Sequence, residues 1–303
     1  MNKLFVLFLF LAAFGAVIFG INKIVDVAEV FREDEEENSA EMPKIPDENA
    51  DEETAQEFST DALDEILRRY DVSVYYENFA TGYTYRHNAD RIFFSASVPK
   101  AFYTLWVFSL AEKGIADLDS LLEFTRIDSN GGSGIIQKNH AYGTQFALRE
   151  LLRLNISESD NVATLMLIRT FGIINYVNFV QESGGNGGFV RDNVFNSLLS
   201  ANEAGNFARK IFEYIEGDGK FSREFKAALL DNKFPFITSK FPVASKTGWT
   251  APKAWHEMAI VYAPSPFALV ILSERDGWKD EDYADFAEIS AAFEKFNENF
   301  LSE

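Results

Sequence analysis

The sequence EMAIVYAPSPFALVILS, residues 257–273, contains two apolar segments on either side of a proline-rich turn. Residues 257–263 and 267–273 are short and rich in aliphatic side chains, which is typical of buried β-strands. A further strand is predicted over residues 243–246. Because turn-forming residues separate the three segments, we expect the strands to reverse direction and to join one antiparallel sheet.

The other strands of this sheet are expected far away in the sequence. Residues 72–76 predict a strand, and residues 83–86 predict its hairpin partner across an Ala-Thr-Gly turn. The chain is then mostly helical to about residue 231, and amphipathic helices are expected after Thr60 and over 280–300. The predicted fold is α/β, of the α+β type, with an antiparallel sheet flanked by the N- and C-terminal helices and an inserted all-helical lobe. Active sites favour the cleft between two such lobes.

The composition excludes several classes of function. With 28 Lys and Arg against 47 Asp and Glu, the net charge of −19 argues against nucleic-acid binding. The absence of cysteine rules out disulfides, thiolate metal sites and a cysteine nucleophile. The three histidines have unrelated spacings, so neither a metal site nor another cofactor is expected. The glycine-rich residues 184–188 lack the sequence context of a phosphate-binding loop.

The N-terminal residues predict a membrane segment followed by an acidic linker. Residues 4–21 are 18 consecutive residues without a polar side chain, which at ~1.5 Å per residue span about 27 Å. Within residues 1–28 we favour a retained anchor over a cleaved signal peptide, and Lys3 places the N-terminus in the cytoplasm. Residues 29–58 contain 13 acidic and 2 basic residues, which is typical of a disordered spacer. We therefore expect residues 59–303 to form one extracytoplasmic domain, which would be secreted if the segment is cleaved.

A serine and a lysine three residues apart stand at the start of a predicted helix. In Ser97-Val98-Pro99-Lys100 the proline suits a first helical turn, where its missing N–H would have no partner. Residues three apart lie on one helix face, so the Lys100 amine can reach the Ser97 hydroxyl. A serine beside an amine base is a nucleophile when burial or a second cation lowers the pKa of the lysine. Taken alone, the pair is interpreted as a solvated surface pair, because Ser-x-x-Lys occurs by chance roughly once in a chain of this length.

Two further tripeptides follow in order along the chain. Ser159-Asp160-Asn161 precedes a helical segment, and Lys246-Thr247-Gly248 ends a predicted strand. Each also has a structural interpretation, as a helix cap and as a strand end with a turn glycine. All three motifs in this order are improbable by chance. A cationic Lys246 near Lys100 would lower the pKa of Lys100 and attract an anionic substrate, and Gly248 leaves room for a close backbone approach.

These motifs resemble those of the penicillin-recognising serine hydrolases, and within them the class A β-lactamases and their relatives. The resemblance covers most of residues 71–277 and extends to the framework segments 78–83, 131–137 and 148–152. It implies a β-lactamase/transpeptidase-like fold and acyl-enzyme chemistry on β-lactam or D-Ala-D-Ala-type amides. The implied partners are small-molecule β-lactams or peptidoglycan stem peptides.

The resemblance also implies a role for each motif residue. Ser97 would form the acyl-enzyme, Lys100 would take its proton, and Ser159 would relay a proton to the leaving nitrogen. The oxyanion hole would consist of the backbone N–H groups of Ser97 and Trp249. Asn161 would also orient Lys100. The residues implied in substrate binding are Asn161, Lys246, Thr247 and Gly248.

The sequence departs from the class A pattern after the second motif. Class A β-lactamases carry a glutamate in a long loop, in a Glu-x-x-x-Asn pattern, that activates the deacylating water. Here the only acid between residues 184 and 200 is Asp192, while Glu182 and Asn186 have the spacing but Glu182 ends a predicted helix. Both carboxylates are candidate deacylation bases, with a surface or capping role as the alternative. The bulky Trp249 could narrow the cleft, stack on a substrate or pack as a structural residue.

Three functions remain open at this point. The first is a β-lactamase that opens the lactam and releases the product. The second is a D-alanyl-D-alanine carboxypeptidase or related peptidoglycan hydrolase, for which β-lactams are slow substrates. The third is a non-catalytic binding module on the same fold, against which the four intact motif residues argue: Ser97, Lys100, Ser159 and Lys246.

Overall fold

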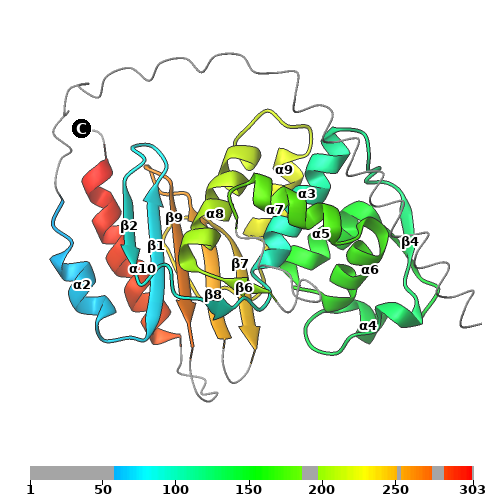
Figure 1. Cartoon of the computed structure of the whole chain (residues 1–303), viewed down its shortest axis with the longest axis horizontal. Coiled ribbons are helices and arrows are strands. Elements are labelled where there is room, and N and C mark those ends of the chain that lie inside the picture. Colours follow the sequence, from blue (N-terminus) through cyan, green and yellow to red (C-terminus); the bar gives the residue numbers. More distant parts are fainter. Residues whose placement is uncertain (1–57, 186–196, 251–253, 275–282, 302–303) are drawn as a thin grey trace, which may run out of the picture. The chain divides into compact units, whose positions relative to one another are not determined.

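The computed structural model describes residues 58–185, 197–250, 254–274 and 283–301. Its main sheet has the strand order β2-β1-β9-β8-β7, and all neighbours are antiparallel (Figure 1). The strands are β1 (Val72–Asn78), β2 (Thr84–His87), β7 (Val243–Thr250), β8 (Ala254–Val261) and β9 (Phe267–Ser273). β1 pairs with β9 along its whole length, so strands from the two ends of the domain meet, as the sequence predicts.

Two helices cover one face of the sheet, as predicted. They are α2 (Asp61–Leu67) and α10 (Ala284–Asn297), which continues into a 3-10 helix (Glu298–Phe300). Aromatic rings fill the space beneath them: Tyr76 of β1 stacks on Phe293 of α10, with ring centroids 5.4 Å apart. Large aromatic side chains bury much apolar area per residue, which makes this contact a stable anchor for the sheet.

The opposite face of the sheet is covered by α8 (Ala201–Ile215), beyond which the remaining helices gather (Figure 1). Those helices are α3 (Pro99–Glu112), α4 (Ile136–Asn139), α5 (Leu148–Ser157), α6 (Asn161–Phe171), α7 (Ile174–Glu182) and α9 (Ser222–Leu230). Nearly all of α3 is buried, so its N-terminal end is held in a fixed place relative to β7.

The inserted lobe is not all-helical, which corrects the sequence prediction. It contains two short strand pairs, β3 (Phe93–Phe94) with β6 (Leu198–Leu199) and β4 (Leu121–Glu123) with β5 (Gln145–Ala147), and a 3-10 turn (Arg126–Asp128). Strands of two or three residues are too short to produce a periodic pattern in the sequence.

The C-terminal strands are longer than predicted. β8 begins at Ala254 rather than residue 257, and β7 continues past Gly248 to Thr250, because Trp249 pairs with Trp255 across the two strands. Lys246-Thr247-Gly248 therefore lies within a strand and not at its end.

The predicted membrane segment, residues 4–21, lies outside the described residues, as does the acidic linker except for Phe58. Among the residues the structure does describe, no single helix is long and apolar enough to cross a bilayer. One pair, α6 and α7, meets the length and apolarity requirement together, with a bend of 93° between the two helices.

Candidate active site

Ser97 lies in a tight turn between β3 and α3. α3 begins at Pro99, two residues after the serine. The turn is held at its start by the Ser95 N–H, which donates to the carbonyl of Ser197 at 3.0 Å. Ala96 has φ of +46°, a left-handed conformation that is costly for a residue with a side chain. Backbone strain is thus stored immediately before Ser97.

β7 approaches this turn through Gly248. A Cβ at Gly248 would lie 2.9 Å from the backbone nitrogens of both Ser97 and Val98. Any side chain would push the strand and the turn apart. Within the described residues the Ser97 N–H has no protein acceptor, so it can donate to an oxyanion at this point.

Lys100 is completely buried one helical turn after Ser97. Its Nζ donates to the Ser159 carbonyl at 2.6 Å, to Asn161 Oδ1 at 2.8 Å and to Ser159 Oγ at 3.3 Å. Burial, with a further contribution from the Lys246 charge, holds the pKa of Lys100 well below its usual value, whereas Asp160 acts in the opposite direction. A neutral amine has two N–H donors and one lone pair. Burial favours this neutral form, whose lone pair is the group that accepts a proton.

Ser159 is shared by two lysines. Lys246, also completely buried, donates from Nζ to Ser159 Oγ at 3.0 Å and to the Thr247 carbonyl at 2.6 Å. Burial lowers the pKa of Lys246 to about 7, against an opposing effect of Glu257. Ser159 itself has φ of +49°, which turns its carbonyl and hydroxyl towards the amines. The hydroxyl can therefore pass a proton between Lys100 and a group in front of it.

Asp160 holds this second motif in place. One of its oxygens caps α6 by accepting from the N–H groups of Val162 and Ala163, at 2.8 and 3.0 Å. The other accepts from Ile135 N at 2.6 Å and Ile136 N at 2.8 Å. The capping role considered from the sequence is thus real, and the same carboxylate also ties the 135–136 segment to the site.

The nucleophile opens onto a cavity of about 570 Å³. It is lined by Phe94, Ala96, Ser97, Gly132, Ser133, Gly134, Ile135, Lys138, Glu158, Asn161, Phe234, Trp249 and Thr250. Ser97, Asn161 and Trp249 were named from the sequence. Lys100, Ser159 and Lys246 lie behind this surface, linked to it by the contacts above.

The family model of the beta-lactamase enzyme family matches residues 59–296 of this chain. The chain belongs to the beta-lactamase enzyme family. No curated protein matches it significantly. Among solved structures, a beta-lactamase from Sphaerobacter thermophilus DSM 20745 has a TM-score of 0.73 at 17% identity, over 81% of this chain and 100% of that chain.

The fold is shared with penicillin-binding relatives as well. PBP-A has a TM-score of 0.69 at 19% identity, over 78% of this chain and 97% of that chain. A single-substitution variant of PBP-A, solved as an acyl-enzyme complex with penicillin G, has a TM-score of 0.67 at 20% identity, over 77% of this chain and 94% of that chain. At these identities the likeness establishes the fold of the beta-lactamase family and not the substrate.

Several lining residues of this beta-lactamase-family site were not found from the sequence. They are Phe94, Lys138, Glu158 and Phe234. Each comes from a different segment, and no local pattern marks a residue that reaches a cavity through tertiary packing. Ser159 and Ala96 likewise adopt left-handed backbone conformations that their residue types do not signal.

The two candidate deacylation bases are placed differently. Glu182 is exposed at the C-terminal end of α7 and does not line the cavity. Asp192 lies outside the described residues. Among the described lining residues the only carboxylate is that of Glu158, directly before Ser159. Trp249 lines the cavity and also stacks on Trp255, with ring centroids 6.2 Å apart, so its ring both shapes the cleft and packs within the fold.

Thr247 is not among the residues that line the cavity. Its hydroxyl donates to the Phe234 carbonyl at 2.8 Å and accepts from Asn232 Nδ2 at 3.0 Å. Its side chain is almost fully buried. Binding of a substrate carboxylate by this hydroxyl, as the resemblance implies, would require it to leave the Phe234 carbonyl.

A buried carboxylate supports the strand that carries Lys246. Glu257, opposite Thr247 in the sheet, accepts from Ser245 Oγ at 2.5 Å and from the N–H groups of Phe236 and Ile237 at 2.5 and 2.6 Å. Burial raises the pKa of Glu257 to about 7, and these donors act in the opposite direction. Among the described residues no group of His, Cys, Asp and Glu is arranged to hold a metal ion.

Proposed function

We propose that the chain is an extracytoplasmic serine hydrolase, anchored by residues 4–21, that forms an acyl-enzyme at Ser97 with β-lactams in the manner of class A β-lactamases. The observation that carries the proposal is the buried Lys100 amine, which has an acceptor for each N–H of its neutral form. A general base must be unprotonated at the working pH, and burial favours the unprotonated amine. Family membership supports a serine acyl-enzyme mechanism.

The acylation steps use the three motifs together. Ser97 Oγ attacks the lactam carbonyl carbon while its proton passes to the Lys100 amine. The N–H groups of Ser97 and Trp249 stabilise the oxyanion. The C–N bond then breaks, the nitrogen takes the Ser159 hydroxyl proton, and Lys100 returns a proton to Ser159. The products are an ester at Ser97 and a protonated ring nitrogen, with Lys100 neutral again.

Charge favours an anionic substrate at this site despite the acidic chain. Lys246 lies directly behind the cavity, and its protonated form acts at short range in a poorly solvated region. Asn161 Oδ1 is held by Lys100, and its Nδ2 donates to the Gly131 carbonyl at 2.9 Å. The Asn161 amide is therefore fixed at the cavity wall, where it can meet a substrate amide.

One observation favours slow hydrolysis of the acyl-enzyme, as expected for the peptidase alternative. Hydrolysis of the ester needs a positioned base for water. Of the described lining residues only Glu158 has a carboxylate, and Glu182 does not reach the cavity. We therefore propose D-alanyl-D-alanine carboxypeptidase activity with slow β-lactam turnover as the second candidate function.

A time course of intact-protein mass with penicillin G, with product analysis, tests both candidates. Rapid loss of the adduct with accumulating penicilloate supports a β-lactamase. A persistent adduct, together with D-Ala release from a peptide ending in D-Ala-D-Ala, supports the peptidase. Absence of both reactions, with Ser97→Ala as the blank, refutes the proposed chemistry and leaves a binding module.

Carboxylate variants locate the deacylation base in the same assay. Glu158→Gln, Glu182→Gln and Asp192→Asn should each leave acylation unchanged, and the variant that prolongs the adduct identifies the base. Protease treatment of intact and permeabilised cells tests the proposed location. Digestion of the domain in cells whose inner membrane is intact supports an extracytoplasmic position, and protection until that membrane is permeabilised refutes it.

A further inference from the structure

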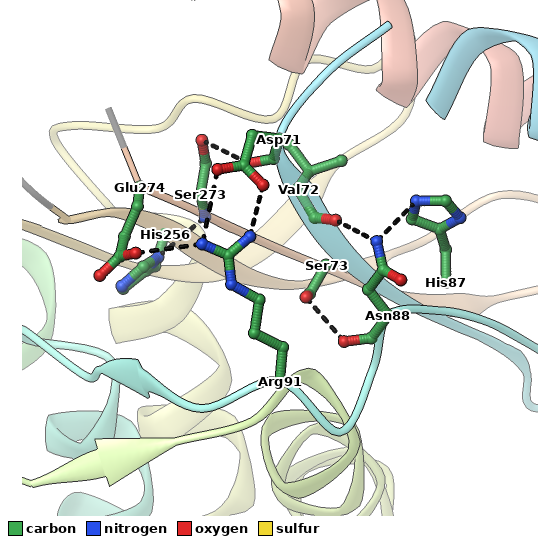
Figure 2. Close-up of polar contacts among 9 residues, drawn as sticks. All are labelled: Asp71, Val72, Ser73, His87, Asn88, Arg91, His256, Ser273 and Glu274. Atoms are coloured by element: carbon green, nitrogen blue, oxygen red, sulfur yellow. Dashed lines mark hydrogen bonds and ion pairs between the residues drawn. The ribbon is translucent and has the colours of Figure 1, made fainter. Parts of the chain in front are cut away.

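His256 is a completely buried histidine that the proposed reaction does not use. It lies in β8, where its Nδ1 accepts from the Ser273 N–H at 3.2 Å and its Nε2 contacts the Phe94 carbonyl at 2.8 Å. Figure 2 shows the imidazole beside Ser273, at the end of the sheet where Arg91 also binds. Both ring nitrogens are therefore engaged by backbone groups from different segments.

These two contacts define one tautomer. A backbone N–H can only donate, so Nδ1 of His256 must be the acceptor and Nε2 must carry the proton. Nε2–H then donates to the Phe94 carbonyl. If Nδ1 were protonated, its N–H would face the Ser273 N–H, and two donors cannot form a hydrogen bond with each other. Burial acts in the same direction and lowers the pKa of His256 to about 4.

The carbonyl that His256 holds belongs to the segment leading to Ser97. Phe94 ends β3, and the strained Ala96 follows two residues later. In the register of the sheet, His256 lies directly opposite Gly248. Gly248 is the residue whose Cβ, if it had one, would lie 2.9 Å from the backbone nitrogen of Ser97. His256 and Gly248, which are opposed in the sheet, therefore lie against the two ends of the turn: His256 against Phe94, and Gly248 against Ser97.

The charged side chains near His256 that Figure 2 draws form ion pairs with each other. Arg91 forms ion pairs with Asp71 and with Glu274, the latter at 3.1 Å, as drawn in Figure 2. The Arg91 guanidinium lies 4.7 Å from the centre of the Phe93 ring. That ring meets the His256 imidazole edge to face at 5.5 Å. No carboxylate within the described contacts of His256 is placed to stabilise an imidazolium.

We propose that His256, as the neutral Nε2–H tautomer, is a positioning residue that holds the Phe94–Ser97 turn in the geometry needed for acylation. It acts through the Phe94 carbonyl and does not touch the substrate. The effect should appear in the acylation rate constant and not in the concentration at half-saturation. The kinetic part of this inference rests on the proposed function, whereas the tautomer and the backbone contact do not.

Two substitutions separate positioning from simple space filling. His256→Phe keeps a planar ring but removes the hydrogen bonds of the imidazole to the Phe94 carbonyl and the Ser273 N–H. His256→Gln can accept from Ser273 N and donate to Phe94 O through the two ends of its amide. We expect penicillin G acylation to slow about 10- to 100-fold in His256→Phe, with the half-saturating concentration within about threefold of wild type, and to recover to within about threefold in His256→Gln. His87→Phe is the matched control and should acylate at the wild-type rate.

Two readouts do not depend on penicillin. Long-range ¹H–¹⁵N correlation spectra of the ¹⁵N-histidine protein, assigned by the His87 and His256 variants, should show Nε2–H for His256 well below neutral pH. Amide exchange at Ser97 and Val98 should accelerate about tenfold or more in His256→Phe and stay slow in His256→Gln.

The outcomes separate the two proposals. An Nδ1–H tautomer or an imidazolium at neutral pH overturns the inference, as does unchanged acylation or unchanged amide exchange in a folded His256→Phe. If wild type is not acylated, the proposed function fails, and the spectra and amide exchange still decide the role of His256. If His256→Phe does not fold, the wild-type tautomer and the acylation rate of His256→Gln decide it: a rate more than about tenfold below wild type overturns the inference.

Discussion

Replacing Gly248 by alanine should disable acylation through a displacement that can be worked out from the structure. The new Cβ would lie 2.9 Å from the nitrogens of Ser97 and Val98, whereas ordinary contacts begin at 3.4 Å, so 3.4 − 2.9 = 0.5 Å of separation is needed. The new Cβ would meet these two backbone nitrogens and also Val98 Cγ2 at 2.9 Å, and the start of α3 behind them is buried, so no long flexible side chain is there to absorb the shift. The Ser97 N–H and Oγ must therefore move relative to β7.

A displacement of this size is expensive for catalysis. Moving reacting groups by about 1 Å, or losing one oxyanion donor, lowers rates on the order of 10²-fold. We expect Gly248→Ala to acylate 10- to 100-fold more slowly, at about 1–3 kcal/mol lower free energy of unfolding from overpacking. The assay is the rate of penicillin G adduct formation by intact mass, measured alongside urea unfolding.

Gly205→Ala is the matched control for this variant. Its Cβ would lie 2.4 Å from Cδ1 of Tyr75, between α8 and β1 and away from the cavity. It should lose as much stability or more while keeping the wild-type acylation rate. Acylation by Gly248→Ala within about threefold of wild type would falsify the close-approach argument, because the 0.5 Å would then have no effect on the reacting groups.

The remaining predictions concern the proton path, the second motif and pH. Ser159→Ala should slow acylation by about 10²- to 10⁴-fold without weakening the fold, since the proton relay is lost; an unchanged rate in stopped-flow mixing contradicts the relay. Because only neutral Lys100 can accept a proton, acylation should fall as pH falls through the pKa of Lys100, which lies well below the ordinary lysine value of 10.5, and a flat profile would exclude Lys100 as base. Asp160→Ala removes the acceptor for four backbone N–H groups and should lower the free energy of unfolding by about 2–4 kcal/mol in urea titrations; a loss below about 0.5 kcal/mol would contradict it. The pKa of His256 is lowered on folding from 6.5 to about 4, so its contribution is present above pH 6.5 and is lost as pH falls through 4, by about 3 kcal/mol; wild type and His256→Gln with parallel pH dependence in chemical denaturation would contradict this.

The sheet and the motif residues could be predicted because their signals are local. Apolar runs bounded by turn residues mark β1 and β9, and a serine and a lysine spaced by three before an apolar helix mark the start of α3. These features depend on neighbouring residues only. The meeting of the two chain ends then follows because neither group of strands can bury both faces alone.

The parts that could not be predicted depend on distant contacts. Phe234 and Glu158 reach the cavity from segments that no spacing rule connects to Ser97. The short β3–β6 pair joins Phe94 to Leu198, which are far apart in the sequence. The hydroxyl of Thr247, expected at the substrate, instead donates to the Phe234 carbonyl, and this contact with a separate segment has no signal in the sequence.

The most direct test of the central claim is peptide mapping of the penicillin adduct. The protein is incubated with penicillin G, digested after acid quenching, and compared with Ser97→Ala treated in the same way. We predict one adduct per chain, on the peptide containing Ser97, and none in the variant. An adduct on any other residue would contradict the assignment of Ser97 as the nucleophile. So would a wild-type chain that carries no adduct and neither binds nor hydrolyses penicillin G.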